Sequence, residues 1–316
     1  MAKHLAQTPL PPRTRRKKKK GRIIRLIWTI SYRLLILYLI VNGGHFLWQR
    51  FFSPKTTSQP QSSQTVSSSN QSSSRNSNES DSISWKKQSQ PVKIPILMYH
   101  AIHVMDPSEA ANAGLIVDPE TFESHLKALK DAGYYTLTPE EAHKVLTENV
   151  LPENKKVVWL TFDDSMADFY SNAFPLLKNY QMKATNNVIT GFVQEGRPSN
   201  LTLAQMKEMK KAGLSFEDHT VNHPDLEISD STSQESELRD SKDFLDQELS
   251  QKTTTVAYPA GRYSDITLQI AENLGYKLGL TTNEGLASLD NGLLSLNRIR
   301  INPTTSAEEL LSRINP

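Results

Sequence analysis

The sequence predicts an α/β fold in which parallel strands close, or nearly close, into a barrel. Segments with strand and helix patterns alternate about seven times between residue 92 and the C-terminus. Those roughly 225 residues are enough for one domain of barrel size. The chemically distinctive side chains fall just after predicted strands, where the active sites of such barrels form. Together these three observations predict one barrel domain with its site at the carboxyl ends of the strands.

Each strand is predicted from a short apolar or β-branched run, and each helix from its caps. The predicted strands are 94–99, 157–162, 184–189, 214–216, 255–258, 277–280 and 298–301. Asp118 and Thr202 are expected to cap helices that end at Gly133 and Gly213, and Thr138 opens a capping box with Glu141. Further helices are predicted near 169–180, 233–249, 265–274 and 307–313. No internal repeat is evident.

The composition narrows the class of protein. The chain of 316 residues contains no Cys, which excludes a disulfide framework and a thiolate metal site. Residues 1–50 hold 12 of the 36 Lys and Arg and none of the 34 Asp and Glu. The remainder therefore carries 24 basic and 34 acidic residues, a net charge near −10. Nucleic-acid binding by that acidic part is not expected.

The N-terminal 52 residues have the pattern of a membrane anchor. Residues 1–22 form a basic tail, and 23–52 are largely apolar with interruptions at Arg25 and Arg33. A span of about 34–52 leaves Arg33 at the interface, and basic residues before the span predict a cytoplasmic N-terminus. A cleaved signal peptide is the alternative, but no Ala-x-Ala-like site follows the apolar run. A nucleic-acid-binding basic arm is a weaker alternative.

A linker is predicted to separate this anchor from the barrel. Residues 53–91 are rich in Ser, Gln, Asn and Thr and contain few aliphatic side chains. Such a segment cannot bury enough apolar surface to offset the entropy lost on ordering. The expected organisation is a tail at 1–22, a transmembrane anchor at 23–52, a disordered linker at 53–91 and a catalytic domain at 92–316, outside the membrane. The sequence leaves the oligomeric state open.

Two carboxylates and two histidines form the candidate site. Asp163 and Asp164 end a buried strand, and His219 and His223 follow a later one. Two imidazoles and one carboxylate can hold a divalent metal, which leaves the second carboxylate as a base. Taken separately, the Asp pair is typical of a turn or helix cap, and the His pair of a surface coincidence. Both pairs just after predicted strands favour a site.

These residues carry a resemblance to a known family. Thr161 to Asp164 and His219 to His223 resemble the first two motifs of the polysaccharide deacetylase family, the NodB homology domain. The segment 95–100 resembles the opening of its branch containing poly-N-acetylglucosamine deacetylases, and 257–261 resembles that branch's third motif. The likeness covers about residues 92–303. It implies a distorted (β/α) barrel of the polysaccharide deacetylase type and metal-dependent removal of acetyl groups from N-acetylated sugars.

The resemblance also implies roles for single residues. Asp163 would be the general base, and Asp164, His219 and His223 would bind the metal, expected to be zinc with cobalt or nickel as alternatives. A late histidine that serves as the acid in many members has no counterpart beside Arg298, so His100 is the candidate acid. The alternative for His100 is a strand-end histidine bonded to backbone. His125 and His143 lie in helix patterns and are interpreted as structural or exposed, and His103 is undecided.

Three residues are weaker candidates for the oxyanion and substrate region. The backbone N–H of Ala260 is expected to stabilise the oxyanion, and Tyr258 and Arg298 are candidates for substrate contact. The arginine that orients the base in the third motif is absent, so Arg262, Arg298 or Arg300 is expected to replace it.

Four departures from the family pattern bear on the site. Ser165 stands where Gly is usual, and Asn186 and Asn187 stand where the pattern has two Phe. Asp218 precedes the first histidine, where it could be a partner of an imidazole. None of these changes removes a candidate metal ligand.

The expected function is removal of acetyl groups from an N-acetylglucosamine-containing glycan of the cell wall or an exopolysaccharide, by a bacterial enzyme anchored in the membrane. An O-acetyl esterase of the same fold, or a weakly active glycan-binding protein, are the alternatives. Substrate assays discriminate the first of these, and loss of Asp163 or of a ligand would have signalled the second.

Overall fold

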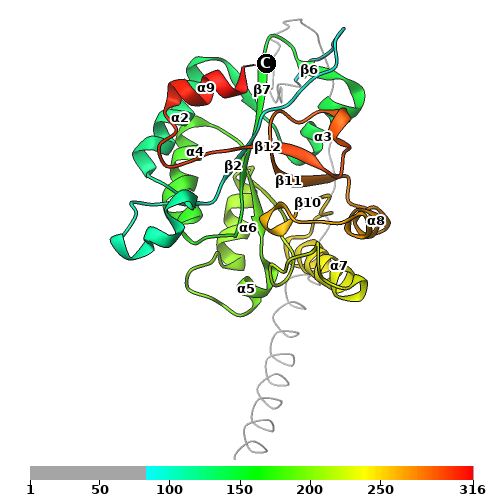
Figure 1. Ribbon diagram of the computed structural model, residues 1–316. Coiled ribbons are helices and arrows are strands. Elements are labelled where there is room, and N and C mark those ends of the chain that lie inside the picture. Colours follow the sequence, from blue (N-terminus) through cyan, green and yellow to red (C-terminus); the bar gives the residue numbers. More distant parts are fainter. Residues whose placement is uncertain (1–82, 316) are drawn as a thin grey trace, which may run out of the picture. The chain divides into compact units, whose positions relative to one another are not determined.

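A closed barrel of parallel strands forms the centre of the computed structural model, which describes residues 83–315 (Figure 1). The strands around the barrel are β2 (Ile96–Tyr99), β7 (Lys156–Phe162), β8 (Thr185–Val188), β9 (Ser215–Asp218), β10 (Thr255–Ala257), β11 (Leu278–Glu284) and β12 (Leu296–Arg300). Each pairs in parallel with the next, and β12 pairs with β2, so the sheet has no open edge there. The predicted parallel barrel is confirmed.

The barrel is distorted at β7. The first half of this strand pairs with β5 (Tyr134–Thr136), with Tyr135 opposite Val157. The second half pairs with β8, with Thr161 opposite Thr185. Strand β5 is therefore attached to the wall but does not form part of the closed ring.

Helices surround the barrel. They are α2 (Pro119–Asp131), α3 (Pro139–Glu148), α4 (Phe174–Tyr180), α5 (Thr190–Gln194), α6 (Leu203–Lys211), α7 (Ser231–Leu249), α8 (Asp265–Asn273) and α9 (Ala307–Ile314), with single turns at η3 (Pro259–Gly261) and η4 (Leu289–Asn291). In Figure 1, α2, α4 and α9 lie to the left of the strands, and α7 and α8 to the lower right. The side chains of Asp118, Thr138 and Thr202 cap their helices as predicted. The predicted helix near 169–180 is interrupted: a π-helical turn, η2 (Phe169–Ala173), precedes α4.

Apolar side chains fill two layers of the barrel. Outside the strands, the rings of Tyr99, Phe122, Phe162 and Phe169 pack on one another beneath α2 and η2. Inside, Trp159 is fully buried and donates its indole N–H to the hydroxyl of Thr185 at 2.8 Å. Because successive side chains of a strand point to opposite faces, alternate residues of β7 belong to these two layers.

Several short elements were not predicted. β1 (Trp85–Lys87) pairs antiparallel with β6 (Val150–Pro152), and β3 (Ala101–Ile102) pairs with β4 (Ile116–Val117) across the 3₁₀ turns of η1 (Pro107–Leu115). Strand β1 lies inside the range 53–91 that the sequence assigned to the linker. The folded unit therefore begins before residue 92, because the backbone of 85–87 is hydrogen-bonded to that of 150–152.

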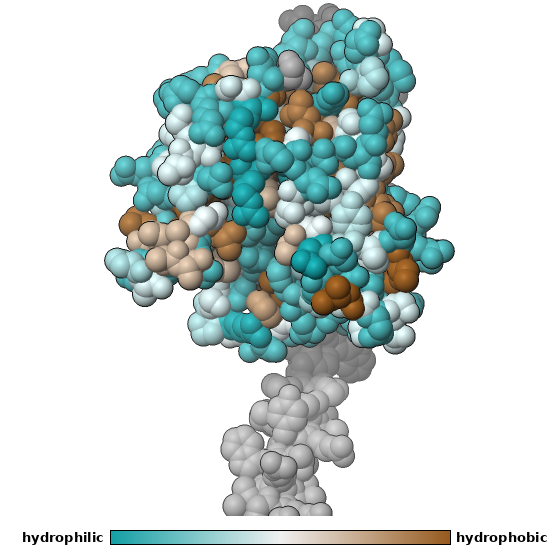
Figure 2. Space-filling view, viewed as in Figure 1, coloured by the Kyte–Doolittle hydropathy of each residue, from teal (hydrophilic) through white to brown (hydrophobic). Residues whose placement is uncertain are grey.

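The predicted tail at 1–22 and anchor at 23–52 lie outside the described residues. Between residues 83 and 315, no helix has the length and apolar character needed to cross a bilayer. The face of this unit in Figure 2 is mostly hydrophilic. Among the large hydrophobic side chains of the described residues, Val104, which precedes η1, is 73% exposed.

Candidate active site

Three side chains converge at the carboxyl ends of β7 and β9. The Oδ1 atom of Asp164 lies 3.4 Å from Nε2 of His219 and 3.7 Å from Nε2 of His223. One donor atom from each residue lies within 4.8 Å of the others. Tetrahedral ligands at about 2.0–2.1 Å from a zinc ion are separated by roughly 3.4 Å, so the spacing and the N,N,O donor set fit a divalent metal. The sequence prediction of this trio agrees with where the structure places it.

The orientation of His219 leaves its Nε2 atom available as a ligand. Its Nδ1–H donates to the carbonyl of Ala257, the last residue of β10, at 2.7 Å. Burial by itself would lower the pKa of His219, but the neighbouring carboxylates of Asp164 and Asp163 raise it. Burial would raise the pKa of Asp164, and His219 lowers it.

The two histidines sit on a loop, not on a helix. The N–H of Thr220 donates to Asp218 at 2.6 Å, and the N–H of His223 to the hydroxyl of Thr220 at 3.0 Å. The amide of Gly191, in α5, donates to the carbonyl of Val221 at 2.9 Å. A Cβ atom at position 191 would lie 2.5 Å from that carbonyl oxygen, so glycine is required for this close approach. Neighbouring elements therefore fix the loop between the two ligands.

The sequence suggested that Asp218 is a hydrogen-bond partner of an imidazole, but its hydrogen bonds go to other groups. It is fully buried and accepts hydrogen bonds from the hydroxyls of Ser241 and Tyr276 as well as from Thr220. Burial raises its pKa to about 6, against these hydrogen bonds. The carbonyl of Ala257, and not Asp218, accepts the hydrogen bond from the imidazole of His219. Asp218 instead anchors the loop through the amide of Thr220.

Left-handed backbone conformations are concentrated at this rim. Asp164, Ser165, Thr220, His223 and Ala260 all have positive φ angles, between 50° and 72°. Such angles are uncommon for residues with a Cβ atom and cluster at functional sites. The φ of 50° at Ser165 explains why glycine is the usual residue there, since glycine adopts this conformation without strain.

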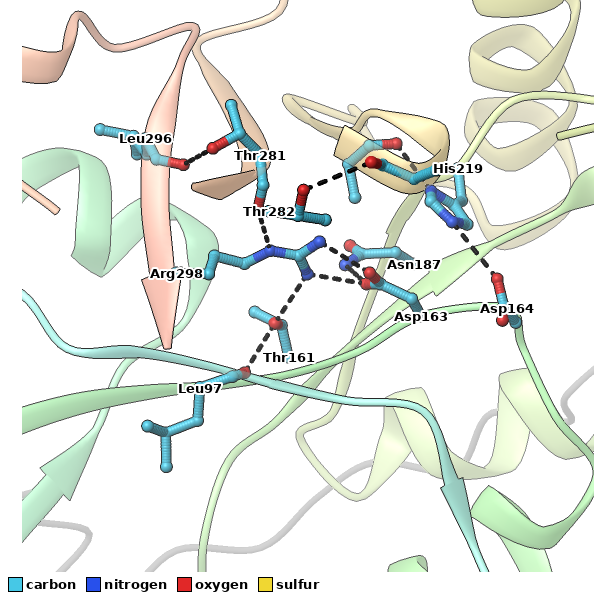
Figure 3. Close-up of polar contacts among 12 residues, drawn as sticks. Leu97, Thr161, Asp163, Asp164, Asn187, His219, Thr281, Thr282, Leu296 and Arg298 are labelled. Carbon is cyan, nitrogen blue, oxygen red and sulfur yellow. Dashed lines mark hydrogen bonds and ion pairs between the residues drawn. The ribbon is translucent and has the colours of Figure 1, made fainter. Parts of the chain in front are cut away.

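The carboxylate of Asp163 is held by a buried network. Arg298 of β12 donates from its two terminal nitrogens to Oδ1 at 2.9 Å and Oδ2 at 2.7 Å, and Asn187 of β8 donates to Oδ1 at 2.7 Å (Figure 3). The Nε–H of Arg298 donates to the carbonyl of Thr281, which fixes the guanidinium plane. Burial would raise the pKa of Asp163, but the charge of Arg298 holds it well below its ordinary value. Asp163 is therefore ionised.

Of the candidate arginines, Arg298 is hydrogen-bonded to Asp163. Arg262 pairs instead with Asp225 at 2.7 Å and Glu227 at 3.0 Å, at the surface. Arg298 is fully buried, with its guanidinium beneath Asp163. This burial argues against its predicted contact with substrate.

His100 lies next to the candidate ligands, whereas His103 is bound to carboxylates elsewhere. His100 follows β2, next to the site, because the amide of Asp163 donates to the carbonyl of Tyr99 at 3.0 Å. Burial lowers the pKa of His100, and the charges of Asp163 and Asp164 oppose that effect. His103 bridges Asp168 at 2.6 Å and Glu109 at 3.0 Å, so both of its nitrogens are engaged away from the candidate ligands.

His125 and His143 also lie away from the candidate ligands. His125 is buried between the hydroxyl of Tyr99 and the carbonyl of Thr305, which confirms its structural interpretation. His143 is partly buried in α3.

Ala260 and Tyr258, two of the candidates for contact with the oxyanion or the substrate, differ in their exposure to solvent. Ala260 is exposed on η3, whose two turn hydrogen bonds come from the amides of Gly261 and Arg262, and not from its own amide. The side chain of Tyr258 is fully buried, and its hydroxyl donates to the carbonyl of Leu294 at 2.9 Å. The prediction that Tyr258 contacts substrate is therefore wrong, because its ring packs outside the barrel with Leu238 and Val256.

A hollow of about 320 Å³ adjoins the candidate ligands. Its lining includes Asp164 and His223 together with Met166, Ile189, Phe192, Arg197 and Asn222. A larger hollow of about 730 Å³, lined by residues of α8 and the 292–295 segment, touches none of the candidate ligands. The smaller one is therefore the candidate substrate site.

Known proteins with similar sequences are polysaccharide deacetylases or their homologues. The family model for polysaccharide deacetylases matches residues 151–279. YxkH, a polysaccharide deacetylase homologue of Bacillus subtilis (strain 168), is 43% identical over 228 residues, which are 72% of this chain and 78% of that protein. The poly-β-1,6-N-acetyl-D-glucosamine N-deacetylase of Staphylococcus aureus (strain MRSA252) is 31% identical over 62% of this chain and 71% of that one.

A solved structure of a deacetylase has a similar fold. The Streptococcus pyogenes deacetylase PplD, in complex with acetate, is 63% identical and superposes with a TM-score of 0.70, covering 72% of this chain and all of that one. In this chain a buried carboxylate, Asp163, lies beside a two-histidine, one-carboxylate set at the mouth of a parallel barrel. The chain belongs to the polysaccharide deacetylase family, whose enzymes act on the amide bond of N-acetyl groups.

Proposed function

We propose that the chain is a metal-dependent N-deacetylase of glycans that contain N-acetylglucosamine. The observation that supports this most directly is the juxtaposition of an ionised, arginine-held Asp163 with the three donor atoms of Asp164, His219 and His223. The relative from Staphylococcus aureus is named for the same chemistry on poly-β-1,6-N-acetyl-D-glucosamine. The proposed substrates are therefore such a polymer or the N-acetylglucosamine of the cell wall.

The residues have complementary roles in amide hydrolysis. A divalent metal held by Asp164, His219 and His223, proposed to be zinc with cobalt or nickel as alternatives, would polarise the acetyl carbonyl and lower the pKa of water. Asp163 accepts the proton of the attacking water. The amide N–H of Ala260 donates a hydrogen bond to the developing oxyanion. His100 donates a proton to the glucosamine nitrogen as it leaves.

The hollow beside His223 is proposed to bind the glycan. Its wall includes the ring of Phe192, over which the guanidinium of Arg197 lies 3.5 Å from the ring centroid. Glu195 holds that guanidinium through its Nε–H at 2.7 Å. The stacked pair offers a flat edge with hydrogen-bond donors, which suits the hydroxyl groups and apolar face of a sugar ring.

The location is proposed from the sequence alone. The basic tail at 1–22, the apolar segment at 23–52 and the polar linker place the barrel outside the cell membrane, on a single-pass anchor with a cytoplasmic N-terminus. Protease added to intact cells should release the barrel domain. Protection of the domain until the membrane is lysed would contradict this topology.

The test of activity uses the full-length protein with N-acetylglucosamine oligomers and with cell-wall fragments. Mass spectrometry should show loss of acetyl groups and new free amines. The protein should contain about one equivalent of divalent metal, and His219→Ala or His223→Ala should lose both metal and activity. His143→Ala, which changes a histidine in α3, is the matched control and should retain both.

The result that would overturn the proposal is equally specific. Acetate release only from O-acetylated glycans would indicate an esterase. Full activity in His219→Ala, with no metal bound, would remove the metal from the reaction.

A further inference from the structure

Two adjacent asparagines on β8 face opposite sides of the barrel wall. Asn187 points inward, is fully buried, and donates from Nδ2 to Oδ1 of Asp163 at 2.7 Å (Figure 3). Asn186 pairs in register with Phe162 and Phe216 in the wall. It is also fully buried, and neither polar atom of its side chain has a partner among residues 83–315. The two side chains therefore share burial and strand position but differ in contact with the base.

The hydrogen bonds to Asp163 are unequal on its two oxygens. Arg298 donates once to Oδ1 and once to Oδ2, and Asn187 donates a second time to Oδ1. A carboxylate has about four lone-pair positions, two on each oxygen. Oδ1 is thus fully occupied, while Oδ2 keeps one position that no described side chain fills.

Among the described residues, the side chain of Asn187 has a hydrogen-bond partner for its donor but none for its acceptor. Its Oδ1 atom is buried and has no hydrogen-bond partner in the described part of the chain. An unsatisfied buried polar atom is destabilising. Residues that break a local rule in this way are concentrated at functional sites.

We propose that Asn187 is a positioning residue for the reaction, which saturates Oδ1 of Asp163 and thereby leaves Oδ2 as the oxygen that accepts the proton from water. Arg298 fixes the plane of the Asp163 carboxylate, and Asn187 determines which of the two oxygens remains free to accept a proton. The inference rests on the proposed deacetylase function, in which Asp163 is the base.

The first test is steady-state kinetics of Asn187→Leu in the full-length protein, on N-acetylglucosamine oligomers or cell-wall fragments, whichever the wild type deacetylates. Leucine has a similar volume and no donor. Misplacement of a reacting group by about 1 Å can cost on the order of 100-fold in rate, so kcat should fall roughly 10- to 100-fold. KM should stay within about 3-fold, and metal content should not fall, because no substrate or metal contact is lost.

Two further variants separate donation from packing. Asn187→Asp keeps the shape but replaces the donor with a second carboxylate, and its kcat should fall at least as far as that of Asn187→Leu. Asn186→Leu is the matched control on the same strand. It removes two unpartnered buried atoms, so it should retain kcat with equal or higher Tm.

Crystal structures of the wild type and Asn187→Leu give a readout that does not depend on activity. The carboxylate of Asp163 should rotate, or Oδ1 should gain a water, when the donor is removed. Wild-type kcat in Asn187→Leu, an equal loss of kcat in Asn186→Leu, or an unchanged Asp163 without a new water would each overturn the inference. If Asn187→Leu does not fold, Asn187→Ser, which is too short to reach Asp163, takes its place. A wild type without deacetylase activity would contradict the proposed function, and the two crystal structures would still judge the role of Asn187.

Discussion

Arg298 and Asp163 lie 135 positions apart in the chain, yet their side chains form a bidentate ion pair at 2.9 Å and 2.7 Å inside the barrel. Arg298 is wholly buried and Asp163 is 3% exposed. Breaking such a pair leaves an unpaired buried charge, which costs about 3–5 kcal/mol, whereas the intact pair is close to neutral for stability. The pair is therefore better explained by orientation of the proposed base, Asp163, than by stability of the fold.

We expect Arg298→Lys to lose most of the activity although the charge is kept. A lysine ammonium is a point charge and cannot hold both oxygens in one plane. The kcat should fall by roughly 10-fold or more, and the free energy of unfolding should also fall, as measured in denaturant. Arg262→Lys, at a surface pair, should change neither. Wild-type kcat in Arg298→Lys would show that the planar contact is dispensable.

His100→Ala should keep the fold and the metal but lose about 10²–10⁴-fold in turnover of an N-acetylated glycan, because an amine leaves poorly without a proton. The decline of kcat/KM on the alkaline side of the pH profile should disappear, since deprotonation of His100 no longer matters. An acetyl ester, whose alcohol leaves more easily, should suffer less. Near-normal amide turnover would remove His100 from the mechanism. His103 would not replace it, because both its nitrogens are engaged by carboxylates.

Gly191→Ala should weaken metal binding without touching a ligand. The new Cβ atom would lie 2.5 Å from the carbonyl oxygen of Val221, so the loop that carries His223 must shift. Metal analysis after dialysis should show substoichiometric metal. Gly114→Ala is the control, since a Cβ there meets no atom within 4 Å. Full metal content in Gly191→Ala would show that the loop can adapt.

The His103 bridge should make stability depend on pH. Partial burial lowers the pKa of His103, but the hydrogen bonds to Asp168 and Glu109 raise it overall. Because the pKa is higher in the folded state, the bridge stabilises fully below the unfolded value of about 6.5 and is lost as pH rises through the folded value. The difference in Tm between the wild type and His103→Gln should therefore be larger at pH 5.5 than at pH 8.5. A difference that grows with pH would contradict the assignment.

Much of the fold could be predicted because its signals are local. The caps at Asp118, Thr138 and Thr202 act within a few residues, and the apolar run before Asp163 marks a buried strand without knowledge of its neighbours. Alternation of strands and helices then predicts a parallel barrel. The pairing of β1 with β6 was missed because Trp85 stands among polar residues and its partner lies more than 60 positions later.

The contacts inside the barrel could not be predicted, because they depend on side chains that meet only when the ring closes. The sequence could not show that Arg298, of three candidate arginines, reaches Asp163, or that Asn187 would join it. Tyr258 was misplaced for a different reason. Its distance of two residues from Val256 places both side chains on the outer face, and this alternation was a usable signal.

The pairing of β12 with β2 has a consequence for biosynthesis. A chain grows from its N-terminus, so Asp163 leaves the ribosome 135 residues before the guanidinium that neutralises it. Because β12 lies between β11 and β2, a chain without this strand would lack one wall of the ring and the guanidinium that neutralises Asp163. The same strand therefore closes the sheet and supplies the partner of the proposed base. A nascent or truncated chain that ends before residue 298 can possess every metal ligand and still have no functional base.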